Sequence, residues 1–195
     1  LGVAWLEEPL PMFDVDGMAE LRRRIATPIS GAELHTGWND LRMLLEHECL
    51  DKYQPDSTFS GLTVAKRVMR ACHERGLAFS PHTWTAGIGF LVNLHAFAAY
   101  PARQLLEYPY EPPGWVPEVR DAILEEPIAV RADGTVAVPQ EPGLGLHIDP
   151  RALRRYGRRF YVSTPLRLAV HTIRSKGVRT ALELKRRKDA RAGGS

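Results

Sequence analysis

The 195-residue sequence has little cysteine and no long apolar run. Only Cys49 and Cys72 occur. Two cysteines do not make a disulfide framework, and we expect a reducing, cytoplasmic location. No apolar stretch reaches the roughly 18–20 residues that a membrane-spanning helix needs, so we expect no membrane partner. The first residues, 1–5, have neither the basic start nor the cleavage site of a secretory signal.

A phosphate-binding loop is also absent from the sequence. The tightest glycine segment, Pro142-Gly143-Leu144-Gly145, does not have the spacing of such a loop, and no lysine follows it. We interpret this segment as a structural turn.

Charge is unevenly distributed along the chain. Residues 1–150 contain 12 Lys and Arg against 21 Asp and Glu, whereas residues 151–195 contain 14 against 2. A basic segment can bind nucleic acid, but here no aromatic residues or known binding motif accompany the cations. We therefore expect no nucleic-acid partner and interpret the segment as a solvated basic helix, with residues 190–195 disordered.

Short apolar runs recur along the chain, and each ends on an ionisable residue. These residues, spaced by 23 to 26 positions, are Glu7, Glu33, Asp56, His82 and Glu107. A strand, a helix and their connections take roughly 25–35 residues. The intervals contain helical patterns over residues 14–26, 37–48, 62–75 and 86–100. Strands that alternate with helices indicate parallel βαβ units.

This alternation predicts an α/β fold, namely part of a (β/α)8 TIM-type barrel with about its last five βα units. The fifth strand is expected at residues 105–107. A β-hairpin is expected over residues 128–138, with Asp133-Gly134 as its turn. The sequence thus divides into residues 1–125 (barrel part), 126–160 (hairpin and return segment) and 161–195 (basic helical tail, weakened at Gly177).

The ends of barrel strands supply the chemistry of such folds, because they converge on one mouth. Four carboxylates and one imidazole would then face the same small space. Like charges repel, so carboxylates gather there only around a cation or a shared proton. Mg²⁺ is the expected occupant, because it prefers oxygen ligands.

These motifs resemble those of the enolase superfamily, and within it the mandelate racemase subgroup of the mandelate racemase and muconate lactonizing enzymes. The resemblance runs from Trp5-Leu6-Glu7-Glu8-Pro9 to the glycine segment at 142–145, about three quarters of the chain. It implies that Glu7 and Glu33 are Mg²⁺ ligands.

The same resemblance implies catalytic roles for three further residues. His82, in Ser80-Pro81-His82, would be the general base or acid, and Asp56, in Gln54-Pro55-Asp56, would orient it. Glu107 would hydrogen-bond the substrate carboxylate and the enediolate oxygen.

The resemblance implies a Mg²⁺-dependent enzyme that removes the proton α to a carboxylate. The resulting enediolate can expel a β-hydroxyl, and dehydration of a sugar acid is the expected reaction. A 2-hydroxy acid racemase or a lactone cycloisomerase shares the same first step. The full-length protein is expected to be a homo-oligomer.

The sequence departs from the family pattern at its start. The strand that carries the family's first metal ligand, an aspartate, is absent, as are the lysine base and the capping domain. We therefore expect a fragment of a longer enzyme that is inactive and poorly soluble by itself. The alternative is a non-catalytic barrel remnant kept for binding or assembly.

Two weaker candidates lie near the expected mouth. We interpret His35 first as a structural residue that could also contact substrate, and Trp84 first as a wall of the site that could also belong to the core. Glu33 taken alone could be a salt-bridge partner. Glu8 is expected to support the site or to face solvent.

Overall fold

The chain folds into two compact units, Leu1–Arg155 and Tyr156–Ser195. The computed structural model describes residues 2–101, 104–158 and 164–192. The three-part division predicted from the sequence stays a prediction.

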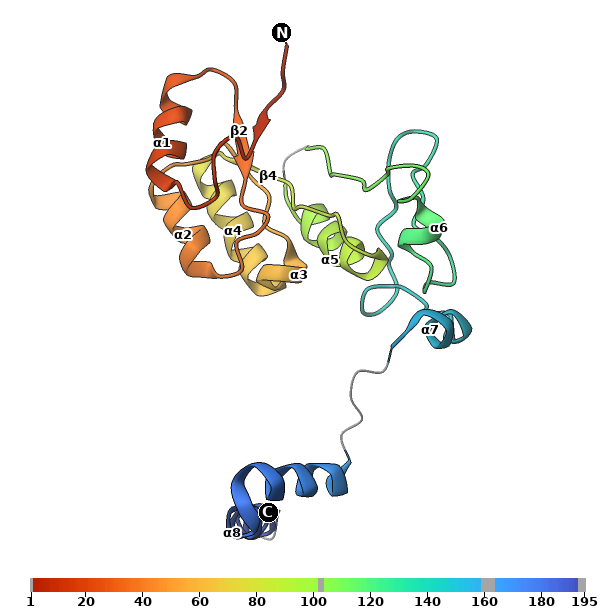
Figure 1. Cartoon of the computed structure of the whole chain (residues 1–195). Coiled ribbons are helices and arrows are strands. Elements are labelled where there is room, and N and C mark those ends of the chain that lie inside the picture. The colour runs from red at the N-terminus through yellow and green to blue at the C-terminus, as the bar shows by residue number, and fades with distance from the viewer. Residues whose placement is uncertain (1, 102–103, 159–163, 193–195) are drawn as a thin grey trace. The chain divides into compact units, whose positions relative to one another are not determined.

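A sheet of four strands forms the centre of the first unit. The strands follow the order β1-β2-β3-β4, and each neighbouring pair is parallel. Their bounds are Leu6–Glu7 (β1), Ile29–Gly31 (β2), Lys52–Tyr53 (β3) and Ala78–Phe79 (β4). Helices separate consecutive strands (Figure 1), so these are the βαβ units that the spacing predicted.

Seven helices lie in or begin in the described part of the first unit, and four of them, α1, α2, α4 and α5, lie close to the predicted positions. Their bounds are Val15–Arg24 (α1), Trp38–Glu46 (α2), Ser57–Ser60 (α3), Leu62–Arg75 (α4), Gly87–Ala98 (α5), Pro117–Arg120 (α6) and Pro150–Tyr156 (α7). Asp14 caps α1 by accepting a hydrogen bond from Gly17 N at 2.9 Å. Gly76 ends α4 in the left-handed conformation, with φ 68°.

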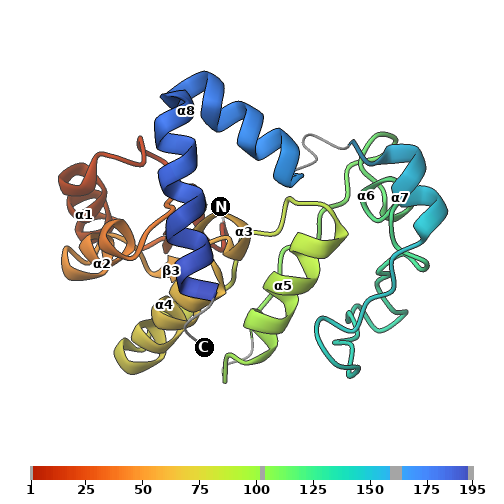
Figure 2. The same cartoon turned by 90° about the horizontal axis from the view of Figure 1, so that it is seen from below.

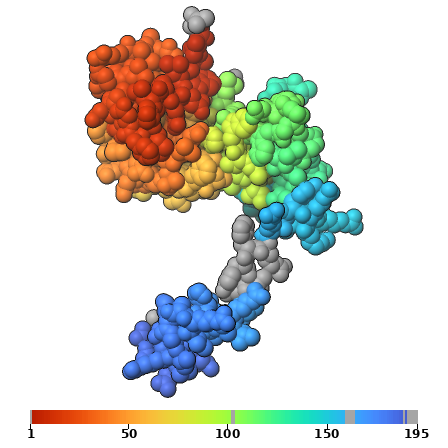
Figure 3. Space-filling view, in the orientation of Figure 1, coloured from red at the N-terminus to blue at the C-terminus, as the bar shows by residue number. Residues whose placement is uncertain are grey.

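One face of the sheet packs against α1, α2 and α4, which lie on the same side of the strands in Figure 1. Ile29, Tyr53 and Phe79 of this face are fully buried. The hydroxyl of Tyr53 donates to the carbonyl of Leu44 in α2 at 2.9 Å. In the space-filling view the residues up to α4 form one continuous mass (Figure 3).

A second apolar cluster forms between α5 and the segment 106–146. The Arg120–Asp121 ion pair lies beside this cluster, with Arg120 Nη2 2.7 Å from Asp121 Oδ2. Both side chains are fully buried. The Arg120 guanidinium lies 4.8 Å from the ring centre of Phe90 and 4.6 Å from that of Tyr108. The pair thereby fixes this loop-rich segment to α5.

The predicted fifth strand, at residues 105–107, is wrong, because this segment has no strand conformation. Side-chain hydroxyls of the neighbouring chain segment contact it instead. Ser80 Oγ donates to the carbonyl of Leu105 at 2.7 Å, and Thr83 Oγ1 donates to the carbonyl of Glu107 at 2.6 Å. With these carbonyls occupied by side chains, the segment runs beside β4 without joining its ladder.

The predicted hairpin at 128–138 is reduced to one antiparallel bridge, between Val130 and Val136. Its turn is present, with Gly134 at φ 80°. The backbone of Ile128 cannot extend the ladder. Its N–H donates to Asp121 at 2.8 Å, and its carbonyl accepts from the hydroxyl of Tyr108 at 2.6 Å.

The second unit contains the helix α8 (Pro165–Ala192), which is interrupted at Gly177 with φ 82° and ψ 162°. The break at the predicted weak point is visible in Figure 2. The helix includes residues 190–192, where disorder was expected, whereas residues 193–195 lie outside the described residues. No helix within the described ranges is both long enough and apolar enough to cross a membrane.

Candidate active site

Four of the predicted site residues lie at the carboxyl ends of the four strands. Glu7 is the last residue of β1, and Glu33 follows β2 by two positions. Asp56 and His82 each follow their strands, β3 and β4, by three positions. The carboxyl ends of parallel strands meet at one edge of a sheet, where active sites of α/β folds form.

His82 and Asp56 form a hydrogen-bonded pair. His82 Nδ1 lies 3.0 Å from Asp56 Oδ2. The Asp56 side chain is fully buried, and that of His82 is 12 % exposed. This contact allows Asp56 to fix the tautomer and the orientation of the imidazole ring.

The second oxygen of Asp56 accepts three further hydrogen bonds. The donors to Oδ1 are Thr58 N at 2.7 Å, Thr58 Oγ1 at 2.7 Å and Asn93 Nδ2 at 2.9 Å. Burial alone would raise the pKa of Asp56, but the hydrogen bonds from His82, Asn93 and Thr58 outweigh it and lower that pKa. Asp56 is therefore held as an anion.

The other ring nitrogen of His82 faces the acidic strand ends. Its Nε2 lies 3.4 Å from Glu33 Oε2. Burial opposes the charged form, but the hydrogen bond to Asp56 and the fields of Glu33 and Glu107 raise the pKa of His82 above its ordinary value. The imidazole thus bridges a buried acid and a half-buried one.

Glu33 belongs to a group of acids at the ends of β1 and β2. Its pKa is raised, first by burial and then by the charges of Glu8, Glu7 and Glu107, while His82 acts in the opposite direction. A cation in this space would relieve the repulsion among these carboxylates.

The backbone at this edge adopts unusual conformations. Glu8 has φ 38° and Ala32 has φ 88°, both in the left-handed region that non-glycine residues rarely occupy. The two are joined, because Glu8 Oε1 accepts a hydrogen bond from Ala32 N at 3.0 Å. Glu8 therefore supports the turn that presents Glu33, and strain of this kind clusters at functional sites.

Glu107 lies beside the pair through its contacts with Thr83, the residue that follows His82. Thr83 N donates to Glu107 Oε2 at 2.9 Å, and Thr83 is fully buried. The structure thereby brings Glu107 near His82 although the segment that carries it is not a strand.

The two weaker candidates differ in exposure. His35 is 5 % exposed, and its Nδ1 has no hydrogen-bond partner among the described residues. Burial lowers the pKa of His35 despite the charges of Glu8 and Asp40. Trp84 is 42 % exposed and does not belong to the core. Contact of either residue with a substrate stays a prediction.

Sequence reasoning missed two polar residues of this region. Asn93 contacts both members of the His82–Asp56 pair, and its signal was a lone amide in a helix that is otherwise apolar except for His95. Lys52 in β3 is 8 % exposed, with its Nζ 3.8 Å from the ring centre of Trp5. Burial lowers the pKa of Lys52.

The donor set for Mg²⁺ is incomplete within the described residues. No group of three His, Cys, Asp or Glu side chains there converges closely enough to hold a metal ion. Glu7 and Glu33 nevertheless fit Mg²⁺ chemically, because carboxylate oxygens are its preferred ligands. The acidic field that raises the pKa of Glu33 also favours a cation.

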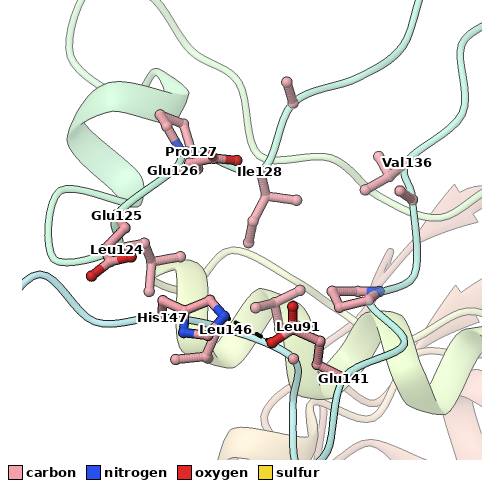
Figure 4. A pocket seen from close by; sticks show the side chains of 14 residues that line it. Leu91, Leu124, Glu125, Glu126, Pro127, Ile128, Val136, Glu141, Leu146 and His147 are labelled. Carbon is pink, nitrogen blue, oxygen red and sulfur yellow. Dashed lines mark hydrogen bonds and ion pairs between the residues drawn. The ribbon is translucent and has the colours of Figure 1, made fainter.

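A separate cavity of about 450 Å³ lies in the loop-rich segment (Figure 4). It is lined by Leu91 of α5 and by residues between 124 and 147. His147 Nε2 contacts Glu141 Oε2 at 2.8 Å on its rim, and both side chains are more than half exposed. None of the predicted site residues lines this cavity.

Comparison with known proteins identifies the family. The model of the family described as "Enolase C-terminal domain-like" matches residues 1–152. The chain belongs to this family. The parallel sheet with its helices is the corresponding part of the TIM-type barrel of enolase-superfamily proteins, so the predicted fold class is confirmed.

The relatives of this family member are lyases and isomerases. The chain is 29% identical over 151 residues to L-talarate/galactarate dehydratase of Salmonella typhimurium LT2, covering 77% of this chain and 34% of that protein. It is 28% identical over 160 residues to D-galactarolactone cycloisomerase of Agrobacterium fabrum C58, covering 80% and 42%. The chain therefore spans less than half the length of either relative.

A solved structure shows the same similarity. The L-talarate dehydratase of Polaromonas sp. JS666, complexed with Mg and L-glucarate, superimposes with a TM-score of 0.65 at 29% identity, covering 80% of this chain and 40% of that one. Homo-oligomerisation and the cytoplasmic location stay predictions.

Proposed function

We propose that this chain supplies the histidine–aspartate pair and two metal ligands of a Mg²⁺-dependent sugar-acid dehydratase. The carrying observation is the contact of His82 Nδ1 with the buried Asp56 at 3.0 Å, while Nε2 faces the acidic strand ends. The dehydratase relatives support the choice of reaction. Because the chain spans less than half of these relatives, the proposal concerns the complete polypeptide that carries this sequence.

Glu7 and Glu33 would hold Mg²⁺ at the ends of β1 and β2. When bound, Mg²⁺ supplies positive charge that offsets the negative charge developing on the substrate carboxylate. Glu8 keeps Glu33 in place through its hydrogen bond with Ala32.

His82 moves the proton at its Nε2 atom. In the neutral ring, Nδ1–H donates to Asp56, so the lone pair of Nε2 faces the site and can accept a proton. Removal of the α proton breaks the C–H bond, and its electron pair enters the conjugated carboxylate. That pair then forms a C=C bond as the β-hydroxyl takes the proton held at Nε2 of His82 and leaves as water, and the resulting enol tautomerises to the keto acid.

Glu107 would bind the substrate carboxylate. Thr83 donates to Oε2 and to the main-chain carbonyl of Glu107, which orients the other carboxyl oxygen. A hydrogen bond between Glu107 and the enediolate oxygen would be strongest when charge has developed on the substrate, so it favours the transition state over the ground state.

A lactone cycloisomerase is the second candidate, and the cycloisomerase relative favours it. Both reactions begin with removal of the same α proton. They differ in the later step, in which the dehydratase expels a hydroxyl group and the cycloisomerase makes or breaks the lactone ring. Product analysis separates them, because the dehydratase releases water and forms a keto acid.

The test is exchange of the α proton in deuterium oxide, followed by proton NMR with Mg²⁺ and galactarate, talarate or glucarate. The complete polypeptide should exchange this proton and form a keto acid. His82→Asn should lower the exchange rate at least about 1,000-fold. His47→Asn, at an exposed histidine, is the matched control and should change nothing. Retained exchange in His82→Asn would show that another group moves the proton.

A further inference from the structure

We infer that Asn93 is a positioning residue that locks Asp56 and His82 in register, an inference that rests on the proposed function. Asn93 lies in α5, about two turns after the start of the helix at Gly87, and its side chain is fully buried. No role in proton transfer is assigned to it, because its amide does not titrate.

The amide of Asn93 uses both of its ends. Nδ2 donates to Asp56 Oδ1 at 2.9 Å and to the carbonyl of His82 at 2.9 Å, and Oδ1 accepts from Ser57 N at 2.8 Å. The partners fix the orientation of the amide, since two of them can only accept and one can only donate. One side chain therefore joins the ends of β3 and β4.

The backbone alone does not make this connection. The last paired residues of β3 and β4 are Tyr53 and Phe79. The ladder continues only as far as the bond from His82 N to the carbonyl of Gln54, at 3.3 Å. Asp56 lies beyond this point, so its position relative to His82 depends on side-chain bonds. Losing Asn93 would leave three buried polar groups with one partner fewer, which is costly in a low-dielectric interior.

Gly89 allows α5 to approach closely enough for Asn93 to reach. It lies one turn before Asn93, on the same face of the helix. A Cβ at Gly89 would lie 2.8 Å from Thr58 Cγ2 and would also clash with Thr85 Oγ1. An alanine there would displace α5 or turn Thr58, whose hydroxyl donates to Asp56. The hydrogen bonds of Asn93 therefore depend on the absence of a side chain at Gly89.

The first variant to test is Asn93→Asp in the complete polypeptide. It keeps the size of the side chain and the acceptor for Ser57 N, but removes the donor to Asp56 and to the carbonyl of His82. The matched control is Asn39→Asp, the same change at an exposed position of α2. Two readouts are needed: α-proton exchange kinetics, and the proton NMR signal of the hydrogen-bonded Nδ1–H of His82 without substrate.

We expect Asn93→Asp to lower kcat for exchange about 100-fold with KM changed less than about threefold, because misplacement of a catalytic group slows chemistry more than binding. The Nδ1–H signal should lose its protection from solvent exchange, and Asn39→Asp should match the wild type. A folded Asn93→Asp with wild-type kcat and an unchanged signal would overturn the inference.

Gly89→Ala decides the matter if Asn93→Asp does not fold. One added methyl group in a packed contact typically costs less free energy than the stability of a typical domain, so this variant should remain folded yet lose signal protection and kcat in the same direction. Unchanged values would overturn the inference. If the wild type exchanges no sugar-acid proton, the proposed function fails, while the NMR signal in the two variants still tests the register of the pair.

Discussion

The candidate site lies along the edge of the four-stranded sheet where the carboxyl ends of the strands meet. The two ends of this edge are organised differently. At the ends of β3 and β4, Asp56 is fully buried and accepts hydrogen bonds on both oxygens, and His82 is fixed between Asp56 and Glu33. At the ends of β1 and β2, Glu7 is exposed, and Glu33 lies in the repulsive field of other acids.

The two ends therefore place opposite demands on their carboxylates. Hydrogen bonds lower the pKa of Asp56, whereas burial and like charge raise that of Glu33. The acid–base end is preorganised by the chain's own side chains. A cation would relieve the repulsion at the acidic end, which is the physical reason why the proposed function places Mg²⁺ there and not beside Asp56.

The largest effect is expected from Asp56→Asn at the preorganised end. The amide keeps the shape of the carboxylate, but its oxygen stays at the Oδ1 position, where Thr58 and Asn93 donate. Its NH2 group then faces Nδ1 of His82 in place of the acceptor Oδ2 and selects the wrong tautomer. Exchange of the α proton in the complete polypeptide should fall about 10³- to 10⁴-fold. Exchange kinetics in deuterium oxide measure it.

The control for Asp56→Asn is Asp133→Asn, which removes a carboxylate from an exposed turn that also binds a neighbouring threonine. It should leave exchange unchanged. An Asp56→Asn variant that is folded and nearly fully active would mean that the preorganised end does not orient the histidine.

A smaller effect is expected from Glu33→Gln at the acidic end. Removing one negative ligand should weaken Mg²⁺ binding at least about tenfold, measured by calorimetry on the complete polypeptide. Glu74→Gln, at an exposed position of α4, is the matched control. The protected Nδ1–H signal of His82 should persist in Glu33→Gln. Its loss would show that the two ends are not independent.

Much of this edge could be predicted from the sequence, because the position of each side chain depends on the strand directly before it. A buried strand followed at a fixed distance by an acid or a histidine predicts where that side chain will lie, and the even spacing predicts parallel pairing. This reasoning places Asp56 and His82 at the same edge of the sheet, and the family resemblance adds their pairing; the structure has them 3.0 Å apart. Asn93 could not be assigned in the same way, because its partners lie outside its own helix. Ser57 is 36 residues away in sequence and His82 is 11 residues away.

The wrong predictions arise where side chains compete with the backbone ladder. Residues 105–107 have the composition of a strand, but the hydroxyls of Ser80 and Thr83 occupy carbonyls that a ladder would use. The hairpin fails at Ile128 for the same reason, since Asp121 takes its N–H. Composition cannot reveal such competition, because it arises only once distant segments are packed.

The smallest effect is expected from Gly76→Ala, which should change the stability of the fold without changing the geometry of the His82–Asp56 pair. Gly76 ends α4 just before β4 with φ 68°, and an added Cβ there would meet no other part of the chain within 4 Å, so Gly76→Ala introduces conformational strain and no clash. We expect it to lower the free energy of unfolding by about 1 kcal/mol, measured by urea denaturation. Gly114→Ala, also in open space but without a positive φ, should cost less. Because side-chain bonds and not this turn hold His82 against Asp56, exchange kinetics should stay at the wild-type value. A large loss of kcat in Gly76→Ala would mean that the backbone path into β4, and not the network around Asn93, sets the geometry of the pair.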